Sequence, residues 1–312
     1  MSIRDLIAAL RCTDGCYTPA AKAELPTSRK PSILGERYYT TPSQKQAVDA
    51  GVADAIRCAS WQAAEFGAIL GKIGTRTLWH DFNAAPHLLI AGESGSGKSV
   101  CIHSIITSLL FKHSPHQLRL VLIDPKRVEL AQYSRLPHLL RPTAKTPDAA
   151  ERALMEVVHE MHSRYRWMES SGLRNMGENA SHIVIVFDEY ATFMSDKRTR
   201  SKLEPLVCDI ARLGRAANIH LVIATQYPTA AVINNQIKSN LNAAIAFRLP
   251  NRTQSRVVLD EGGAELLNGS GDGLYRTSCQ NTQRFQGLYV PDEQIETLVD
   301  YWIAEGKTRR YA

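Results

Sequence analysis

The residues best suited to chemistry stand in one glycine-rich segment directly after the apolar run HLLIA. This segment, GESGSGKS, has the glycine and Lys-Ser spacing of a nucleotide-binding P-loop, and the apolar helical pattern SVCIHSIITSLLF follows it. Glycines let the backbone curl so that its amides, and the start of the helix, face the phosphates. We expect Lys98 to reach the β and γ phosphates of ATP and Ser99 to coordinate Mg²⁺. The predicted phosphate-binding set is Gly92, Glu93, Ser94, Gly95, Ser96, Gly97, Lys98, Ser99 and Val100.

Two further apolar runs end in polar groups that suit ATP hydrolysis. Asp188 and Glu189 follow IVIVF, and Gln226 follows HLVIAT. Asp188 is predicted to hold Mg²⁺ through water, and Glu189 to act as the general base that polarises the attacking water. Gln226 is predicted to contact the γ phosphate or the lytic water. Asp188 and Glu189 alone would suit an ordinary solvated strand end, but a neighbouring P-loop favours the catalytic interpretation.

Short apolar runs alternate with helical stretches beyond residue 86. Runs of consecutive apolar residues are typical of strands buried on both faces, and helices between them imply a parallel, doubly wound α/β sheet. The predicted strands are residues 87–91, 118–123, 183–187, 221–224 and 243–249. The carboxyl ends of such strands meet at one edge, which would bring the P-loop, Asp188, Glu189 and Gln226 together.

The remaining patterns predict smaller elements at the two ends of the chain. Residues 66–82 have a strand, turn, strand pattern with the reversal between Gly71 and Gly74, and a second hairpin is predicted around Gln280-Asn281. A helix is expected to start near Ser43, and an amphipathic helix to cover residues 292–305. We therefore expect an N-terminal extension of helix and loop, residues 1–65, and a motor domain, residues 66–312.

Composition narrows the class of protein. A chain of 312 residues with 44% apolar and 22% charged residues can bury a large core, which excludes disorder as its main state. No window approaches the roughly 18 apolar residues of a membrane span, and MSIRDLIAAL lacks a secretory signal, so we expect a cytoplasmic protein without a membrane span. Six scattered cysteines indicate reduced thiols, with a zinc site at Cys12 and Cys16 as the less favoured alternative. The net charge of +6 permits nucleic-acid binding without requiring it.

Several separated strings resemble the motor domain of the FtsK/SpoIIIE DNA translocases, within the RecA-like ring ATPases. The resemblance runs from about Ile69 to Gly306 and includes LIDPKRVELAQYSRLPHLL, RYRWMESSGLRNM, GRAANIHLVIATQYP and SRVVLDEGGAELLNGSGDGLY. It implies a RecA-like parallel sheet with helices on both faces, a C-terminal hairpin and helix, and a small N-terminal extension. It also implies a hexameric ring around double-stranded DNA, with ATP bound between neighbouring subunits.

The resemblance assigns roles to several basic residues. Lys197, Arg198, Arg200 and Lys202 match a segment that contacts DNA in the pore, although a solvated helix start explains their charge equally well. Arg252 and Arg276 are less favoured pore candidates. Arg215 and Arg256 match family arginines, and either could complete the ATP site of the neighbouring subunit. Residues 242–245, Asn-Ala-Ala-Ile, lack an arginine that many family members carry there.

The resemblance leaves three functions open. The first is an ATP-driven translocase of double-stranded DNA, and a chain that ends soon after the motor domain would suit a plasmid, phage or integrative-element protein. Its N-terminal extension would meet a relaxase, a recombinase or a membrane partner. The second is a protein-export ATPase, against which a single copy of the domain argues. The third is a nucleotide-dependent scaffold with little turnover, against which the presence of Glu189 argues.

Overall fold

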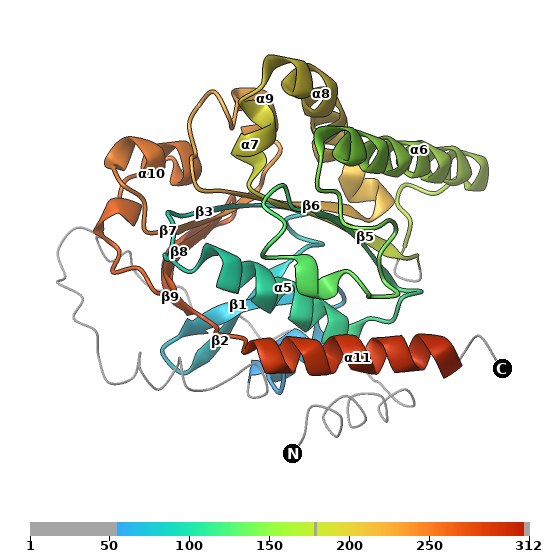
Figure 1. The fold of residues 1–312 in the computed structure, drawn as a ribbon, viewed down its shortest axis with the longest axis horizontal. Helices are drawn as coiled ribbons and strands as arrows, with labels where there is room; N and C mark the ends of the chain where they lie inside the picture. The colour runs from blue at the N-terminus through green and yellow to red at the C-terminus, as the bar shows by residue number, and fades with distance from the viewer. Residues whose placement is uncertain (1–54, 178–179, 309–312) are drawn as a thin grey trace.

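One mixed β-sheet organises the part of the chain that the structure, a computed structural model, describes: residues 55–177 and 180–308. Within these residues the sheet has nine strands in the order β2-β1-β9-β8-β7-β3-β6-β5-β4. Helices cover both faces of the sheet (Figure 1). The α/β class predicted from the sequence is confirmed, and the predicted parallel strands form one half of a mixed sheet. The predicted helix near Ser43 and the zinc alternative at Cys12 and Cys16 lie outside the described residues.

The central strands run parallel and form the half of the sheet that carries the P-loop. They pair in the order β7, β3, β6, β5, β4, and nearly every residue in them is buried. This explains why their sequences are continuously apolar rather than alternating. Each lies within two residues of its predicted bounds. The strands are β3 (His87–Ala91), β4 (Leu118–Ile123), β5 (His182–Asp188), β6 (Ile219–Thr225) and β7 (Ala243–Phe247).

The other half of the sheet is antiparallel and extends the parallel half without a break. Its strands are β1 (Gly67–Ile73), β2 (Arg76–Asp81), β8 (Asp272–Thr277) and β9 (Gln280–Gly287). The two predicted hairpins therefore belong to the same sheet, because β8 pairs with β7 and β9 pairs with β1. Gly71 lies within β1 and not in its turn, and it pairs with Gly287 of β9. Only glycine fits there, because a Cβ would come within 2.0 Å of the Gln286 carbonyl oxygen. The second turn lies at residues 278–279, before Gln280.

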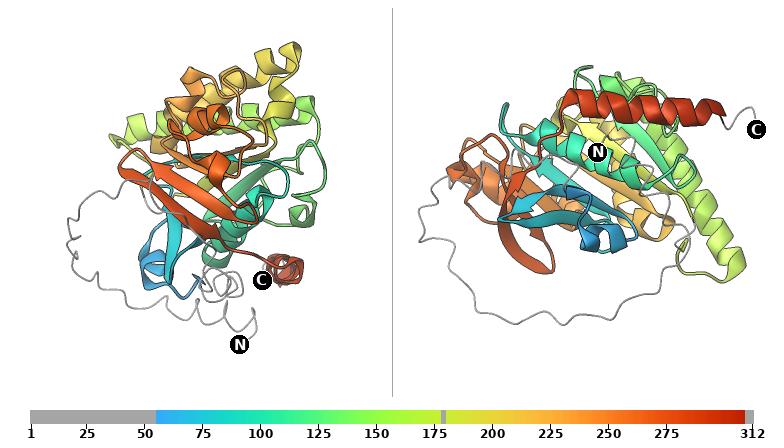
Figure 2. Two further views of the ribbon diagram at one scale, coloured as in Figure 1. Left: turned by 90° about the vertical axis from the view of Figure 1, so that its left-hand side faces the viewer. Right: turned by 90° about the horizontal axis from the view of Figure 1, so that it is seen from below.

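Two layers of helices enclose the sheet (Figures 1 and 2). One layer holds α5 (Lys98–Lys112) and α11 (Asp292–Thr308), which extends beyond its predicted end at residue 305. The other holds α6 (Pro147–Ser171), α7 (Tyr190–Met194), α8 (Lys197–Leu213), α9 (Asn235–Lys238) and α10 (Arg252–Leu259). Side-chain caps set their starts, with Thr146 accepting from the Ala149 amide and Asp196 from the Thr199 amide. No helix among residues 55–177 and 180–308 is long and apolar enough to span a membrane.

Residues 55–65, the last part of the predicted extension, pack against α5 and β1. Ala55, Ile56 and Trp61 lie in the same hydrophobic core as α5 and β1, and the Trp61 indole donates to the Gly67 carbonyl at 2.9 Å. Helix α4 (Ala59–Ala63) carries Trp61, and the Lys112 ammonium lies 5.3 Å from the Trp61 ring centre. The N-terminal segment thereby contacts the helix that begins at the P-loop.

A group of buried histidines lies where the parallel strands begin. The His182 ring stacks on Phe66 at 3.7 Å between centroids, and its Nδ1 lies 3.0 Å from His220 Nε2. Burial lowers the pKa of His80 and His113 to about 3 and of His87, His138 and His182 to about 4, and it lowers that of His220 as well. All six are therefore neutral in the fold at pH 7.

These histidines should make the fold sensitive to mild acid. Their pKa values are depressed, so the stability they contribute is present above the unfolded value of about 6.5 and is lost as the pH falls toward the folded values. Each can lower the free energy of unfolding by up to about 1.4 kcal/mol per pH unit in that window. We expect the urea midpoint of unfolding to fall as the pH is lowered from 7.5 to 5. It should fall less steeply in His182→Gln, and as steeply as in the wild type in His162→Gln, which replaces an exposed histidine. A pH-independent midpoint would contradict this.

Candidate nucleotide site

The P-loop connects β3 to α5 and has the backbone conformation that phosphate binding requires. Gly97 caps α5 with φ +114°, a left-handed conformation that side chains disfavour. A Cβ at Gly97 would also lie 2.7 Å from the Cα of Gly271, which precedes β8. The Gly271 amide donates to the Ser96 carbonyl at 2.8 Å, and the Ser96 hydroxyl donates to the Glu93 carbonyl at 2.6 Å. Contacts within the protein thus hold the loop in shape.

The first residues of the loop are held by the neighbouring strands β6 and β7. The Gly92 amide donates to the Thr225 carbonyl at 3.3 Å, and the Glu93 amide donates to the Arg248 carbonyl at 3.0 Å. The Glu93 carboxylate also forms an ion pair with the Arg248 guanidinium. The Glu93 side chain thus helps to hold the loop against the end of β7.

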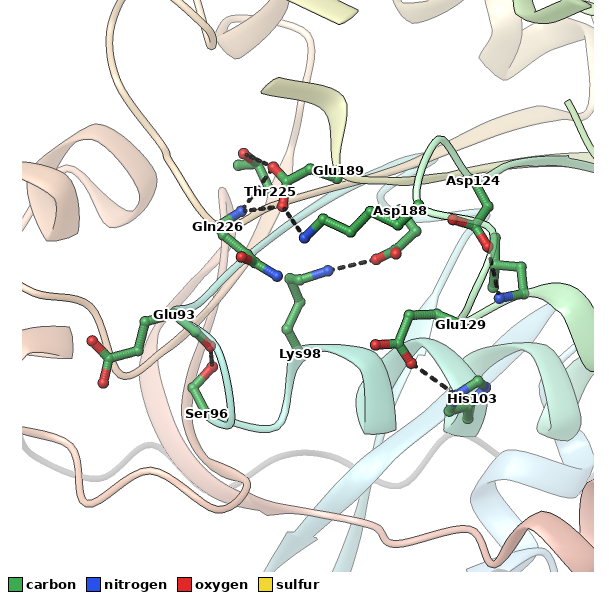
Figure 3. Close-up of polar contacts among 12 residues, drawn as sticks. Glu93, Ser96, Lys98, His103, Asp124, Glu129, Asp188, Glu189, Thr225 and Gln226 are labelled. Carbon is green, nitrogen blue, oxygen red and sulfur yellow. Dashed lines mark hydrogen bonds and ion pairs between the residues drawn. The ribbon is translucent and has the colours of Figure 1, made fainter. Parts of the chain in front are cut away.

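Lys98 and Asp188 form the central ion pair of the site. The Lys98 ammonium lies 2.5 Å from Asp188 Oδ1, and the two side chains are 4% and 1% exposed. Lys98 opens α5 and Asp188 ends β5, so the pair joins two elements that lie 90 residues apart. Figure 3 shows Lys98, Asp188, Glu189 and Gln226 converging on one place. The predicted juxtaposition of the three strand ends is found in the structure.

Glu189 is buried and held by three neighbours. Its carboxylate accepts from the Thr225 hydroxyl at 3.0 Å, from the backbone amide of Gln226 at 3.1 Å, and from the Lys126 ammonium at 3.4 Å. Its side chain is 3% exposed. Its backbone has φ +99°, a conformation that is strained for a residue with a side chain and is concentrated at functional sites.

A cleft of about 400 Å³ opens beside the P-loop. Lys98, Ser99, Val100 and Gln226 lie on its lining, as do four other P-loop residues, Glu93, Ser94, Gly95 and Gly97. The opposite wall comes from Ser270, Gly271, Gln286, Gly287 and Tyr289. The antiparallel half of the sheet therefore completes the site that the parallel half begins.

Three residues of this site were not predicted: Asp124, Lys126 and Glu129, all in the loop after β4. Asp124 is fully buried, and its carboxylate accepts from the backbone amides of Arg127 at 2.8 Å and Leu130 at 3.2 Å. Glu129 lines the cleft. An acidic residue at the end of the apolar run LRLVLI is the same signal that singled out Asp188, so the sequence contained the clue.

Neither candidate arginine reaches this cleft within its own chain. Arg215 lies in the 3-10 helix Gly214–Ala217, directly before β6, and its guanidinium donates to the Asn83 carbonyl at 3.3 Å. This position is at the opposite edge of the sheet from the P-loop. Arg256 lies exposed on α10.

Only two of the four basic residues predicted to contact DNA have side chains that are exposed to solvent. Lys202 pairs with Glu151 at 2.6 Å, and Arg200 donates to the Ala231 carbonyl. Lys197 and Arg198, at the start of α8, are exposed. Of the less favoured candidates, Arg276 pairs with Asp260, whereas Arg252 is exposed.

The chain is similar to DNA translocases of bacteria. The FtsK/SpoIIIE family profile matches residues 57–182. The chain is 42% identical to the DNA translocase FtsK of Halalkalibacterium halodurans over 259 residues, 77% of this chain and 33% of that protein. It is 40% identical to the DNA translocase SpoIIIE of Bacillus subtilis over 247 residues, 73% of this chain and 31% of that protein. The chain thus spans about a third of the length of these relatives.

Solved structures give the same result for the fold. The conjugation coupling protein TcpA of pCW3, solved as a monomer with ATPγS, is 30% identical with a TM-score of 0.67, over 77% of this chain and 71% of that one. The cytoplasmic domain of the type VII secretion ATPase EccC of Thermomonospora curvata is 23% identical with a TM-score of 0.66, over 75% of this chain and 30% of that one. The second likeness concerns the fold alone.

Gly97→Ala should disable the phosphate-binding loop. The substitution combines an unfavourable φ with a clash against the Gly271 backbone, so we expect about 1–3 kcal/mol lower stability and loss of nucleotide binding. The matched control is Gly172→Ala, at the end of α6, which has φ +68° and nothing within 4 Å of the added Cβ. It should lose about 1 kcal/mol while binding normally. Thermal unfolding and titration with a fluorescent ATP analogue measure both effects, and normal binding by Gly97→Ala would contradict the prediction.

Proposed function

Because the chain belongs to the FtsK/SpoIIIE family of P-loop ATPases, we propose that it hydrolyses ATP to move along double-stranded DNA. One observation carries the proposal: the P-loop and Gln226 line one cleft, Asp188 and Glu189 contact them directly behind it, and the chain is 40–42% identical to DNA translocases. The proposal places the protein in the cytoplasm, where ATP and duplex DNA occur.

The phosphates would bind over the start of α5. Backbone amides of residues 94–99 and the positive end of the helix dipole favour an anion there, and Lys98 adds a full charge. Ser99 and Asp188 suit Mg²⁺, since a hydroxyl and a carboxylate are hard oxygen donors beside the phosphate site. The described residues contain no cluster of three or more His, Cys, Asp or Glu side chains that could hold a metal, which fits a cation bound mainly through phosphates and water. Bound Mg²⁺ would neutralise charge on the phosphate oxygens.

Hydrolysis would depend on Glu189 and Gln226. Glu189 is held by the Thr225 hydroxyl and by the backbone amide of Gln226, at the end of β6. These bonds would fix its carboxylate as the base for the attacking water. The Gln226 side chain lines the cleft and can donate to the γ phosphate or accept from the water. Binding energy from the P-loop would place the reacting groups.

A ring would complete the site with an arginine from the next subunit. Head-to-tail contacts, which close into rings, join two different faces of the same chain. Arg215 lies at the edge opposite the P-loop and Arg256 on the exposed side of α10, so either could meet a neighbour's cleft. We favour a hexamer, in keeping with the family resemblance. A guanidinium there would stabilise the charge that develops during phosphoryl transfer.

The DNA would pass Lys197 and Arg198 at the start of α8. Two exposed cations at a helix start can hold phosphates without reading sequence, which suits a motor that must cross any sequence. The likeness to a conjugation coupling protein supports a role in the transfer of plasmid or other mobile DNA. Residues 1–65 would then meet a relaxase, a recombinase or a membrane partner.

The first test of the proposal is the steady-state ATPase rate with and without long duplex DNA. We expect stimulation by duplex that fades as salt rises, because binding to DNA phosphates releases counterions. Glu189→Gln should lower kcat by about 100-fold or more while nucleotide still binds. A rate indifferent to DNA in protein shown to form rings would favour protein export. Full biological function in Glu189→Gln, combined with its loss in Lys98→Ala, would favour a scaffold.

The pore assignment has its own matched pair of variants. Lys197→Gln with Arg198→Gln should weaken duplex binding and reduce the slope of log affinity against log salt by about 0.9 for each DNA phosphate that is no longer neutralised. Arg200→Gln with Lys202→Gln removes the same charge from side chains already engaged within the chain. It should leave that slope unchanged. Equal effects of the two double variants would show that only net charge matters.

A further inference from the structure

Two consecutive carboxylates at the end of β5 each have a lysine of their own. Asp188 pairs with Lys98 at 2.5 Å, and Glu189 pairs with Lys126 at 3.4 Å. The two lysines come from different segments, the P-loop and the loop after β4. The site therefore holds two cations and two anions in a small space, and only the first pair follows from the P-loop pattern.

The backbone around Lys126 is fixed, whereas its side chain is accessible. The strand β4 lies next to β5, so the loop after it begins beside Asp188 and Glu189. The fully buried Asp124 carboxylate accepts from the amides of Arg127 and Leu130 and holds this loop. The Lys126 side chain is 43% exposed, against 3% for Glu189. A fixed Cα with a flexible, partly solvated ammonium can exchange one anion for another.

We propose that Lys126 binds the γ phosphate of ATP, and that this exchange of partner releases Glu189 to act on water. The inference rests on the proposed function of the site as an ATPase. Lys126 is then a substrate-binding residue that distinguishes ATP from ADP, and it couples that distinction to the general base.

Charge competition supplies the physical reason. A triphosphate brings more negative charge to the site than a single carboxylate, and an ammonium is a strong phosphate ligand. Lys98 and Lys126 pair with the adjacent residues Asp188 and Glu189. A phosphate chain that replaces Asp188 as the partner of Lys98 would therefore bring its terminal phosphate close to Glu189 and Lys126. Glu189 keeps its bonds from Thr225 and Gln226 when Lys126 leaves, and so stays in position. ADP has no terminal group to offer, so Lys126 remains with Glu189.

The test compares the affinities of ADP and a non-hydrolysable ATP analogue, AMP-PNP, by calorimetry on the full chain with Mg²⁺. Lys126→Met should lower AMP-PNP affinity about tenfold and change ADP affinity by less than about twofold, since only the γ phosphate loses a charged hydrogen bond. Lys126→Arg should keep most of the discrimination. Arg127→Met is the matched control, because it removes a neighbouring exposed cation, whereas the ion pairs of Asp188 and Glu189 are made by Lys98 and Lys126.

A second arm tests the competition with Glu189. Glu189→Gln removes the charge that holds Lys126, so AMP-PNP should bind several-fold more tightly than to wild type while ADP does not. Adding Lys126→Met should erase that gain. A lysine that only supports the fold, or only orients Glu189, would show no such dependence on the γ phosphate.

Either of two outcomes would overturn the inference: equal losses for AMP-PNP and ADP in Lys126→Met, or no loss for either. An effect of Arg127→Met equal to that of Lys126→Met would also overturn it, because general charge would then explain the binding. A wild-type chain that binds neither nucleotide would refute the proposed function itself, and this result is distinct because it appears before any variant is compared.

Discussion

The ion pair between Lys98 and Asp188 is the contact on which the rest of the site depends. Both side chains are almost wholly buried, and a buried charge without a partner is strongly destabilising. The pair therefore requires the start of α5 and the end of β5 to stay together. Helix α5 follows β3, and β6 lies between β3 and β5 in the sheet. It also brings Glu189, the next residue along, to the same place. A ligand that takes Lys98 must offer a better anion, which a phosphate chain does.

Both halves of the sheet contribute residues to the cleft. The parallel strands deliver the P-loop, the acids and Gln226 at their carboxyl ends, as expected for α/β sheets. The antiparallel strands bring Gly271, Gln286 and Tyr289 to the facing wall. The Gly271 backbone packs so closely on Gly97 that a Cβ added at Gly97 would lie 2.7 Å from it. Residues from distant parts of the chain thus share one phosphate-binding surface.

Whether a basic side chain of this protein is free to bind a ligand depends on the contacts it makes within the fold. The four basic residues at the start of α8 look equivalent in sequence, yet two are engaged by Glu151 and by the Ala231 carbonyl, and two face solvent. The same holds in the site, where Lys126 resembles an ordinary loop lysine until its contact with buried Glu189 is seen. Long flexible side chains contact whatever the fold places nearby, and linear spacing does not specify that neighbour.

Sequence patterns were enough to predict the α/β class, the parallel strands to within two residues, and the convergence of Lys98, Asp188, Glu189 and Gln226. Local patterns suffice for these because buried parallel strands are continuously apolar and a P-loop has a short, specific spacing. Only the folded structure shows that both hairpins join the same sheet, that Gly71 lies in a strand, and that Lys126 contacts Glu189. Those features depend on contacts between segments far apart in the chain, and in such contacts register and side-chain partners follow from packing, which local sequence does not record.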